Sequence, residues 1–347
     1  MRASGESIST SPGQPMPPRP EARRARLLRA LAVVAAASAV ILAAVYTGVA
    51  SAATQAPTVN RSGLAWASGV YQPNATPASL KAFGAWRGRP MDVATIWGNR
   101  ATWQDLINPA WLYRRWKGAP EILAIGMPML PEKVAGVSIP ACANGSYNSY
   151  WKRFGTNISA YGLGKSIIRL GWEFNGNWYI WKATNPAAWA KCWRQIVTSA
   201  RSTAPNLKWD WNVSRGVAPG LTNPAKAYPG DAYVNTVGVD SYDQWPPAKS
   251  SAGWNQQLNG AQGLMYWLKF AQAHGKKLAI PEWGNMTTGR NPGGDDPAFV
   301  KDMLAFFKAH SQGLAWESNF QGPNIRGSTY NSGSAVPKSA AAYQAGF

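Results

Sequence analysis

Histidine, cysteine and acidic residues are all scarce in this chain. Only two of its 347 residues are histidines. His274 and His310 both lie near the C-terminal ends of predicted helices, where a cation suits the helix dipole. This scarcity argues against a Ser-His-Asp triad and against a zinc site built on histidine. We therefore expect no bound metal.

Two motifs of other protein classes are missing as well. No G-x-S-x-G nucleophile turn is present. The stretch YGLGKS, residues 161–166, imitates a phosphate-binding loop, but Ser159 stands where that loop requires its first glycine. The stretch also leads into a predicted strand instead of a helix. We therefore expect neither nucleotide binding through this loop nor a cofactor.

Because Asp and Glu are few, the chain carries a strong positive net charge. Sixteen Asp and Glu stand against 35 Lys and Arg, which gives a formal net charge of +19, and +15 remains without the first 52 residues, which carry +4. Beyond residue 60 the basic residues are scattered, and no recognised nucleic-acid motif appears. We expect no nucleic-acid partner, and the charge instead favours acidic surroundings such as an anionic envelope or an anionic polymer substrate.

What is present begins with an export signal in residues 1–52. The basic stretch EARRARLLRA is followed by an uncharged, mostly apolar run that ends in small residues up to Ala52. This pattern predicts a signal peptide cleaved near Ala52, or an uncleaved anchor in which residues 30–50 cross the bilayer. In both cases the rest of the chain is secreted or held on the outer face of the cytoplasmic membrane.

The two cysteines are the only candidates for a disulfide. Outside the cytoplasm, Cys142 and Cys192 can oxidise to one bridge. Two isolated buried thiols are the alternative.

Residues 60–347 alternate between predicted strands and helices. Eight apolar, β-branched or aromatic runs are typical of strands; they cover residues 64–71, 91–98, 121–130, 166–174, 207–214, 236–243, 277–284 and 313–320. The clearest helical patterns cover residues 185–201, 261–275, 296–310 and 337–347. Eight such units predict a single (β/α)8 TIM barrel, with a doubly wound open sheet as the alternative fold.

Two glutamates stand out in that barrel. Glu173 and Glu282 are placed at the ends of the fourth and seventh predicted strands, and each is flanked by tryptophan. Active sites of this fold lie at the C-terminal ends of the strands, and a low-polarity setting raises a carboxyl pKa. Two facing carboxyls are what glycosidic cleavage requires, and the 19 tryptophans suit sugar stacking. The alternative is that both glutamates form structural pairs with arginine.

Three segments resemble glycoside hydrolase family 26. IIRLGWEFNGNWYIW (167–181) is similar to that family's acid/base segment, Arg-x-x-His-Glu-Met-Asn-Gly followed by aromatics. AYPGDAYVNTVGVDSYDQW (227–245) is similar to its sixth-strand segment, and KKLAIPEWGN (276–285) to its nucleophile strand. The segments occur in the family's order, and the barrel pattern extends the likeness over residues 60–347.

The resemblance implies a retaining endo-β-glycosidase that works as a monomer. Glu173 would be the acid/base and Glu282 the nucleophile, with their carboxyl groups ~5 to 5.5 Å apart. Tyr242 would hydrogen-bond the nucleophile. Arg169 would either hold a carboxylate charged or form a structural ion pair beneath the site.

Further substrate contacts are implied around the two glutamates. Asn175 and Trp178 follow the acid/base in the family pattern, with the indole as a sugar platform. Trp283 is either a second platform or part of the core. Trp172 departs from the family, because it replaces a histidine that would meet the sugar in the cleavage subsite, and this puts the substrate in doubt.

The substrate class therefore stays open. β-Mannan is the leading expectation, and β-1,3-xylan, mixed-linkage β-glucan, or a bacterial envelope or anionic polysaccharide are the alternatives. A different class of function is a non-catalytic carbohydrate-binding barrel that serves polysaccharide export, held at the membrane by residues 30–50. Two intact glutamates argue against that class, since a pure binder has no need of both.

Overall fold

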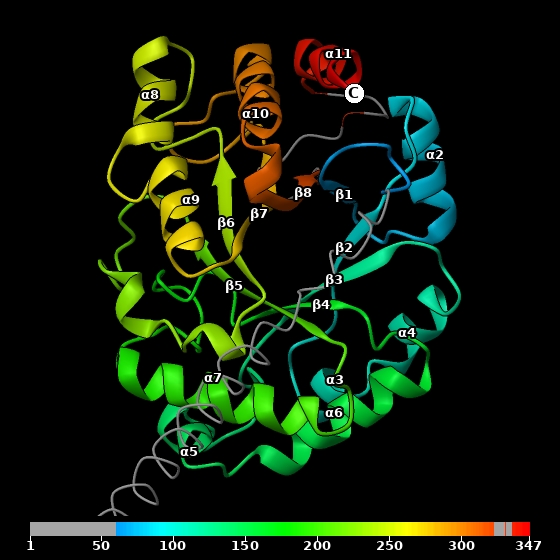
Figure 1. The fold of residues 1–347 in the computed structure, drawn as a ribbon, viewed down its shortest axis with the longest axis vertical. Helices are drawn as coiled ribbons and strands as arrows, with labels where there is room; N and C mark the ends of the chain where they lie inside the picture. Colours follow the sequence, from blue (N-terminus) through cyan, green and yellow to red (C-terminus); the bar gives the residue numbers. More distant parts are fainter. Residues whose placement is uncertain (1–59, 323–329, 331–334) are drawn as a thin grey trace, which may run out of the picture. The chain divides into compact units, whose positions relative to one another are not determined.

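The computed structural model describes residues 60–322, 330 and 335–347, which form a closed barrel of eight parallel strands (Figure 1). The strands are β1 (Ala67–Tyr71), β2 (Val93–Trp97), β3 (Ile122–Met127), β4 (Ile167–Leu170), β5 (Lys208–Ser214), β6 (Thr236–Tyr242), β7 (Lys277–Gly284) and β8 (Leu314–Phe320). Each strand pairs with the next, and β8 pairs with β1. The predicted barrel is confirmed, and the open sheet is wrong.

Helices follow the strands in sequence and surround them (Figure 1). They are α2 (Pro77–Arg87), α3 (Trp103–Ile107), α4 (Ala110–Trp116), α5 (Ile139–Ala143), α6 (Asn148–Ala160), α7 (Pro186–Arg201), α8 (Ser251–Asn259), α9 (Leu264–Ala273), α10 (Pro297–Ala309) and α11 (Pro337–Gly346). The four predicted helices are present as α7, α9, α10 and α11. Local sequence sets their starts: Asn185 and Asp296 cap the first turns of α7 and α10, each with proline at the first helical position.

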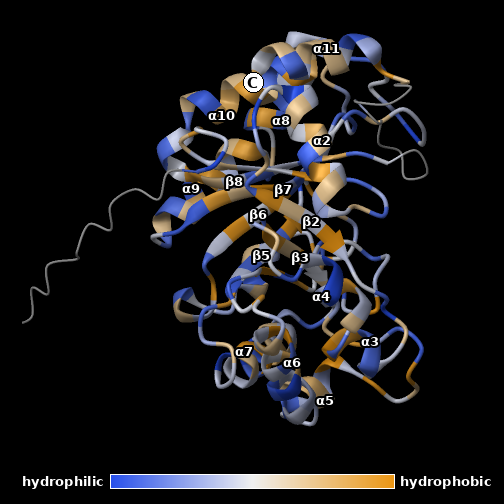
Figure 2. Cartoon of the chain, turned by 90° about the vertical axis from the view of Figure 1, so that its right-hand side faces the viewer, coloured by the Kyte–Doolittle hydropathy of each residue, from blue (hydrophilic) through white to orange (hydrophobic). Residues whose placement is uncertain are grey.

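The apolar core has two parts. A small cluster lies inside the barrel, in the N-terminal halves of the strands. It consists of Val93, Ala124, Ile167, Ala279 and Trp316. A much larger cluster lies between the strands and the helices, and Figure 2 shows the hydrophobic colour along the strands and on parts of the helices. Twelve of the 19 tryptophans are buried. Most of the tryptophan content therefore serves packing, which leaves few indoles for a ligand.

The predicted fourth strand is too long. The sequence pattern predicts a strand that includes Glu173, but β4 ends at Leu170. Gly171 and Glu173 have positive φ angles of 54° and 51°. Left-handed backbone cannot continue a strand. Glu173 therefore lies on a tight turn just above the barrel, not within a strand.

The predicted disulfide is present between Cys142 in α5 and Cys192 in α7, with their Cα atoms 5.0 Å apart. Both cysteines are buried, and α5 packs against α7. No cysteine of the chain remains free. The bridge therefore links the segments that follow the third and fourth strands.

Removing this bridge is expected to lower the free energy of unfolding by ~4 kcal/mol, because it closes a loop of 50 residues in the unfolded chain. Denaturant unfolding of a double variant, Cys142→Ala with Cys192→Ala, measures the loss. Thiol titration of the unfolded, unreduced chain should detect no free thiol. Two titrating thiols would contradict the pairing.

The predicted export segment, residues 1–52, and its possible anchor, residues 30–50, lie outside the described residues. Within the part of the chain that the structure describes, no helix is long and apolar enough to span a bilayer.

Candidate active site

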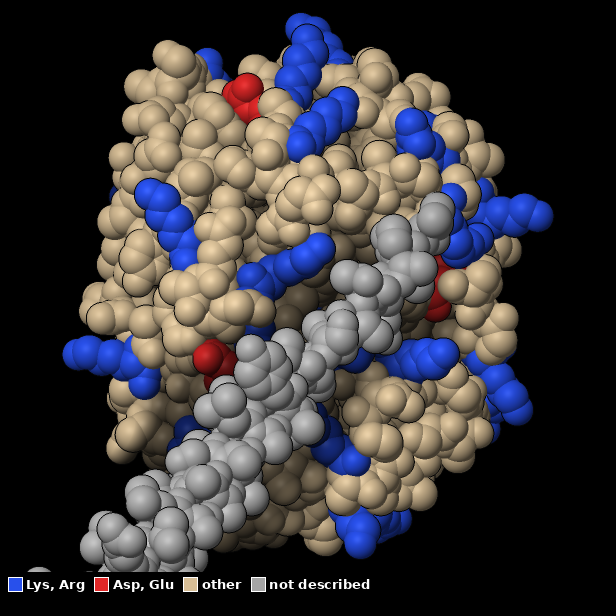
Figure 3. Space-filling view, viewed as in Figure 1, with Lys and Arg blue, Asp and Glu red and all other residues tan. Residues whose placement is uncertain are grey.

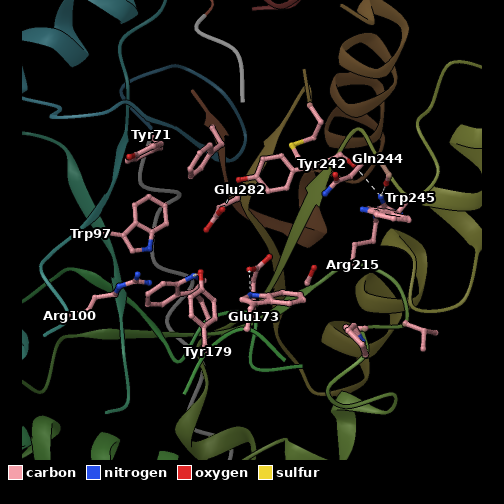
Figure 4. Close-up of a pocket in the computed structure, with 18 residues that line it drawn as sticks. Tyr71, Trp97, Arg100, Glu173, Tyr179, Arg215, Tyr242, Gln244, Trp245 and Glu282 are labelled. Carbon is pink, nitrogen blue, oxygen red and sulfur yellow. Dashed lines mark hydrogen bonds between the residues drawn. The ribbon is translucent and has the colours of Figure 1, made fainter. Parts of the chain in front are cut away.

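A pocket of about 930 Å³ opens at the C-terminal ends of the strands and holds both predicted catalytic glutamates (Figure 4). Its lining comes from nearly every part of the barrel: Tyr71, Trp97, Arg100, Trp172, Glu173, Trp178, Tyr179, Ser214, Arg215, Val217, Ala218, Pro219, Tyr242, Gln244, Trp245, Glu282, Met286 and Phe320. In Figure 4 the Glu173 and Glu282 carboxyls point into the same space from opposite walls. The structure thus brings the two together, as the sequence predicted.

Glu282 lies in β7 and is held by two donors. Arg169 Nη2 donates to its Oε1 at 2.7 Å, and the Tyr242 hydroxyl donates to its Oε2 at 2.6 Å. Burial and the neighbouring carboxylate raise the pKa of Tyr242 well above its usual value, so the phenol stays a donor. Both hydrogen bonds fix the orientation of the Glu282 carboxyl.

Arg169 lies beneath the pocket and is fully buried. Its Nη2 also contacts both Asp240 oxygens, the closer at 2.9 Å, and donates to Asn212 Oδ1 at 2.7 Å. One guanidinium thus serves two carboxyls. Burial raises the pKa of Asp240 well above its usual range, against the pull of Arg169. Of the two alternatives for Arg169, the structure shows both features: it is an ion pair under the site, and it binds the predicted nucleophile.

Glu173 has the opposite environment. Its Oε2 accepts one hydrogen bond, from Trp178 Nε1 at 3.1 Å, and no cation pairs with it within the described residues. Burial, and then the negative charge of Glu282, raise the pKa of Glu173 to about 7. The left-handed backbone at Glu173 is a costly conformation that is typical of functional sites. This carboxyl can therefore carry a proton near neutral pH.

Of the other predicted contacts, Trp172 and Trp178 line the pocket. Trp178 is 49% exposed, and its ring lies over Gly176, where a Cβ would meet the indole at 2.3 Å. Trp172 is almost fully buried, and its Nε1 donates to the Tyr179 hydroxyl at 3.1 Å. The exposed indole is thus available as a platform, whereas Trp172 has its only donor already occupied.

Asn175 and Trp283 do not line the pocket. Asn175 is buried and exchanges two hydrogen bonds of 2.9 Å with the backbone of Ser214, which ties the Glu173 turn to the end of β5. Trp283 points out of the barrel, where its ring packs against Phe299 and Phe307 of α10 and its Nε1 donates to Glu317 Oε2 at 2.6 Å. Trp283 therefore belongs to the core, one of the two placements that the sequence left open.

Sequence reasoning missed most of the pocket lining, including the side with Arg215 and Trp245 and a wall of aromatic rings. Tyr71, Trp97 and Phe320 are the last residues of β1, β2 and β8, and their rings contact one another. An aromatic residue at the last position of a barrel strand was the available signal. The Trp97 ring lies across β3 at Gly126, where a Cβ would meet the indole at 2.1 Å. Only glycine leaves room for this wall.

Sequence comparison identifies the same family as the motifs did. The model described as "Glycosyl hydrolase family 26" matches residues 166–283. "Endoglucanase H" of Acetivibrio thermocellus is 32% identical over 157 residues, which are 43% of this chain and 17% of that protein. "Mannan endo-1,4-beta-mannosidase" of Bifidobacterium adolescentis is 29% identical over 122 residues, 34% of this chain and 12% of that protein. The chain thus spans under a fifth of the length of these curated relatives.

Solved structures share the fold. A modular endo-beta-1,4-mannanase from Cellulomonas fimi has a TM-score of 0.55 at 17% identity, covering 76% of this chain and 64% of that one. The catalytic domain of a family 26 endo-beta-1,4-mannanase from Bacillus sp. JAMB-750 has a TM-score of 0.56 at 17% identity, covering 82% and 86%. At these identities the likeness concerns the barrel alone.

Proposed function

We propose that this chain, which belongs to glycoside hydrolase family 26, is a retaining endo-β-glycosidase that acts outside the cytoplasm. The carrying observation is the contrast between two carboxyls in one pocket: Glu282 accepts hydrogen bonds from Arg169 and Tyr242, while the pKa of Glu173 is about 7. A pair of carboxyls with environments that push their protonation apart is what acid and nucleophile roles require.

In this mechanism Glu282 attacks the anomeric carbon and Glu173 gives its proton to the leaving glycosidic oxygen. The carbon–oxygen bond to the leaving sugar breaks, and a glycosyl ester on Glu282 forms. Glu173, now ionised, takes a proton from water, and that water attacks the same carbon and frees Glu282. Two inversions at the anomeric carbon retain its configuration.

β-Mannan is our leading substrate, because a mannan endo-1,4-beta-mannosidase is among the curated relatives. Other β-glycans and an envelope or anionic polysaccharide are the alternatives. Endo action is supported by a pocket that extends past the glutamates on both sides, to Tyr71 and Trp97 on one and to Trp245 on the other (Figure 4). Export is supported by the N-terminal pattern and by the disulfide, since such bridges persist in oxidising compartments.

The test is to incubate the chain with plant and bacterial glycans and to measure new reducing ends. NMR of the first-formed anomer then reports the stereochemistry. We expect cleavage of at least one β-glycan with retention. An inverted product would remove Glu282 from the nucleophile role, and binding without any cleavage would favour the non-catalytic barrel.

Trp172 is expected to disfavour unsubstituted β-mannan. Its N–H is occupied by Tyr179, so a sugar hydroxyl meets only an apolar face there. Trp172→His supplies a ring that can donate or accept, and should shift the ratio of kcat/KM values towards mannan, relative to the best substrate, by ~1 to 3 kcal/mol.

Trp172→Phe is the matched control, because it removes bulk without adding a polar atom and should not favour mannan. If the wild type already prefers mannan and the histidine variant leaves that preference unchanged, position 172 does not set specificity.

A further inference from the structure

Arg215 is a cation in the pocket wall whose charge the catalytic pair does not use. It follows β5 directly and lines the pocket. Its Nε donates to Ser241 Oγ at 3.0 Å, and its Nη2 donates to the carbonyls of Tyr242 at 3.2 Å and Gln244 at 2.7 Å. All three acceptors are neutral. Nη1 makes no hydrogen bond within the described residues, so one end of the guanidinium remains available.

The other arginines near the glutamates have carboxylate partners. Arg169 pairs with Asp240 and Glu282, and Arg100, at the opposite wall, pairs with Glu132 at 3.4 Å. Arg215 forms no ion pair in the described part of the chain; Asp243 acts on its charge only from beyond ion-pair distance. Burial lowers the pKa of Arg215 to about 10, which leaves it charged at neutral pH. A partly buried cation without a counter-ion is costly, and an anionic ligand would offset that cost.

The position of Arg215 places it on the leaving-group side. Its neighbour Ser214 exchanges two hydrogen bonds through its backbone with Asn175 of the Glu173 turn, and the Glu173 carboxyl must lie beside the departing sugar. Figure 4 shows Arg215 on the same side of the glutamates as Trp245, across from Tyr71 and Trp97. Trp245 is 51% exposed. Its backbone is in the left-handed conformation, with a φ angle of 57°. A charged donor and an exposed indole together suit an acidic sugar ring.

We propose that this leaving-group subsite takes a uronic acid residue, whose carboxylate binds Nη1 of Arg215. The inference rests on the proposed glycosidase function and specifies the chemical class of its substrate. The molecule's surface agrees with it: basic side chains spread over the face in Figure 3 with few acidic ones among them. A positive surface raises the local concentration of a polyanionic glycan.

The test uses a matched pair of polymers, glucomannan and the same glucomannan partly oxidised at C6 to uronate. The ratio of kcat/KM for the oxidised to the neutral polymer is measured in the full chain and in Arg215→Gln, Arg215→Lys and Arg100→Gln. The ratio cancels any general loss of activity. We expect Arg215→Gln to lower it about tenfold or more, the scale of one charge-assisted hydrogen bond. Arg215→Lys should retain most of it, and Arg100→Gln should change it little.

Product ends give an independent readout. Cleavage turns the leaving-group sugar into a new non-reducing end, so mass spectrometry should find uronate enriched within the first two residues of those ends. The enrichment should disappear in Arg215→Gln, and salt raised from about 20 to about 300 mM should weaken it. Uronate spread evenly over both kinds of end, or an equal change in Arg100→Gln, would overturn the proposal while glycosidase activity stands.

If neither polymer is cleaved, the proposed function fails, and binding still decides the subsite. Calorimetry of the full chain with oligomers of both polymers should give tighter binding of the acidic one, and Arg215→Gln should abolish that preference. Equal affinity for both oligomers would refute the acidic subsite.

Discussion

Glu282→Ala is expected to abolish turnover on every substrate, with a loss in kcat on the order of 10⁶, the scale for removing a covalent nucleophile. Among the described residues, the only other carboxyl that lines the pocket is Glu173, on the opposite wall, and Asp240 is held on Arg169 beneath the pocket. The loss must extend to aryl glycosides with activated leaving groups, since these also need a nucleophile. Initial rates on the best glycan and on such an aryl glycoside measure it.

The control for this variant is Glu132→Ala, which removes a partly exposed carboxylate paired with Arg100 and should leave both rates within a few fold. Folding of Glu282→Ala is checked by its thermal transition, since Arg169 keeps Asp240 as a partner. Appreciable turnover of the aryl glycoside by the alanine variant would show that another group forms the covalent bond.

The fold was predictable because its signals are local and repeated. Eight apolar runs alternate with helical patterns, and capping residues such as Asn185 and Asp296 mark where helices begin. The two glutamates were predictable for the same reason, since each follows an apolar run beside a tryptophan. A carboxyl at the C-terminal end of a barrel strand lies on the face of the barrel where active sites are found.

The rest of the site depends on contacts between distant segments. The aromatic wall joins Tyr71, Trp97 and Phe320, whose first and last members are about 250 positions apart in the chain and next to one another in space. Nothing near Arg215 in the sequence shows that its partners are the β6 residue Ser241 and two carbonyls. Sequence supplies the residue types, and closure of the barrel decides which of them meet.

Two tryptophans with the same sequence neighbour, a glutamate, lie on opposite sides of the barrel wall. Trp172 and Trp283 each adjoin a proposed catalytic glutamate, yet Trp172 lines the pocket and Trp283 packs outside the barrel. The difference arises from local backbone. Glu282 and Trp283 lie within β7, where the register with both neighbouring strands shifts just before Trp283, and the Trp283 ring packs against Phe307 of α10. Glu173 instead follows a left-handed turn that strand periodicity cannot describe.

Glu173→Ala is expected to separate two classes of substrate. Glycans with poor leaving groups need the proton of Glu173, so their kcat should fall by ~10² to 10⁴. Aryl glycosides with activated leaving groups do not need it, and should still form the glycosyl ester on Glu282. Their turnover then stalls for lack of a general base. Azide, which attacks without one, should restore it and yield a glycosyl azide of retained configuration.

The pH profile provides the second readout of the same role. The acid must be protonated for the first step, and burial raises the pKa of Glu173 to about 7, so wild-type kcat/KM on glycans should fall as the pH rises through about 7. Glu173→Ala, assayed on the aryl glycoside, should lose that basic limb. Because Trp178 donates to Glu173 and thereby favours its ionised form, Trp178→Phe should move the limb to higher pH. A basic limb unchanged in Glu173→Ala, together with failure of azide to restore turnover, would assign the proton donor to another residue.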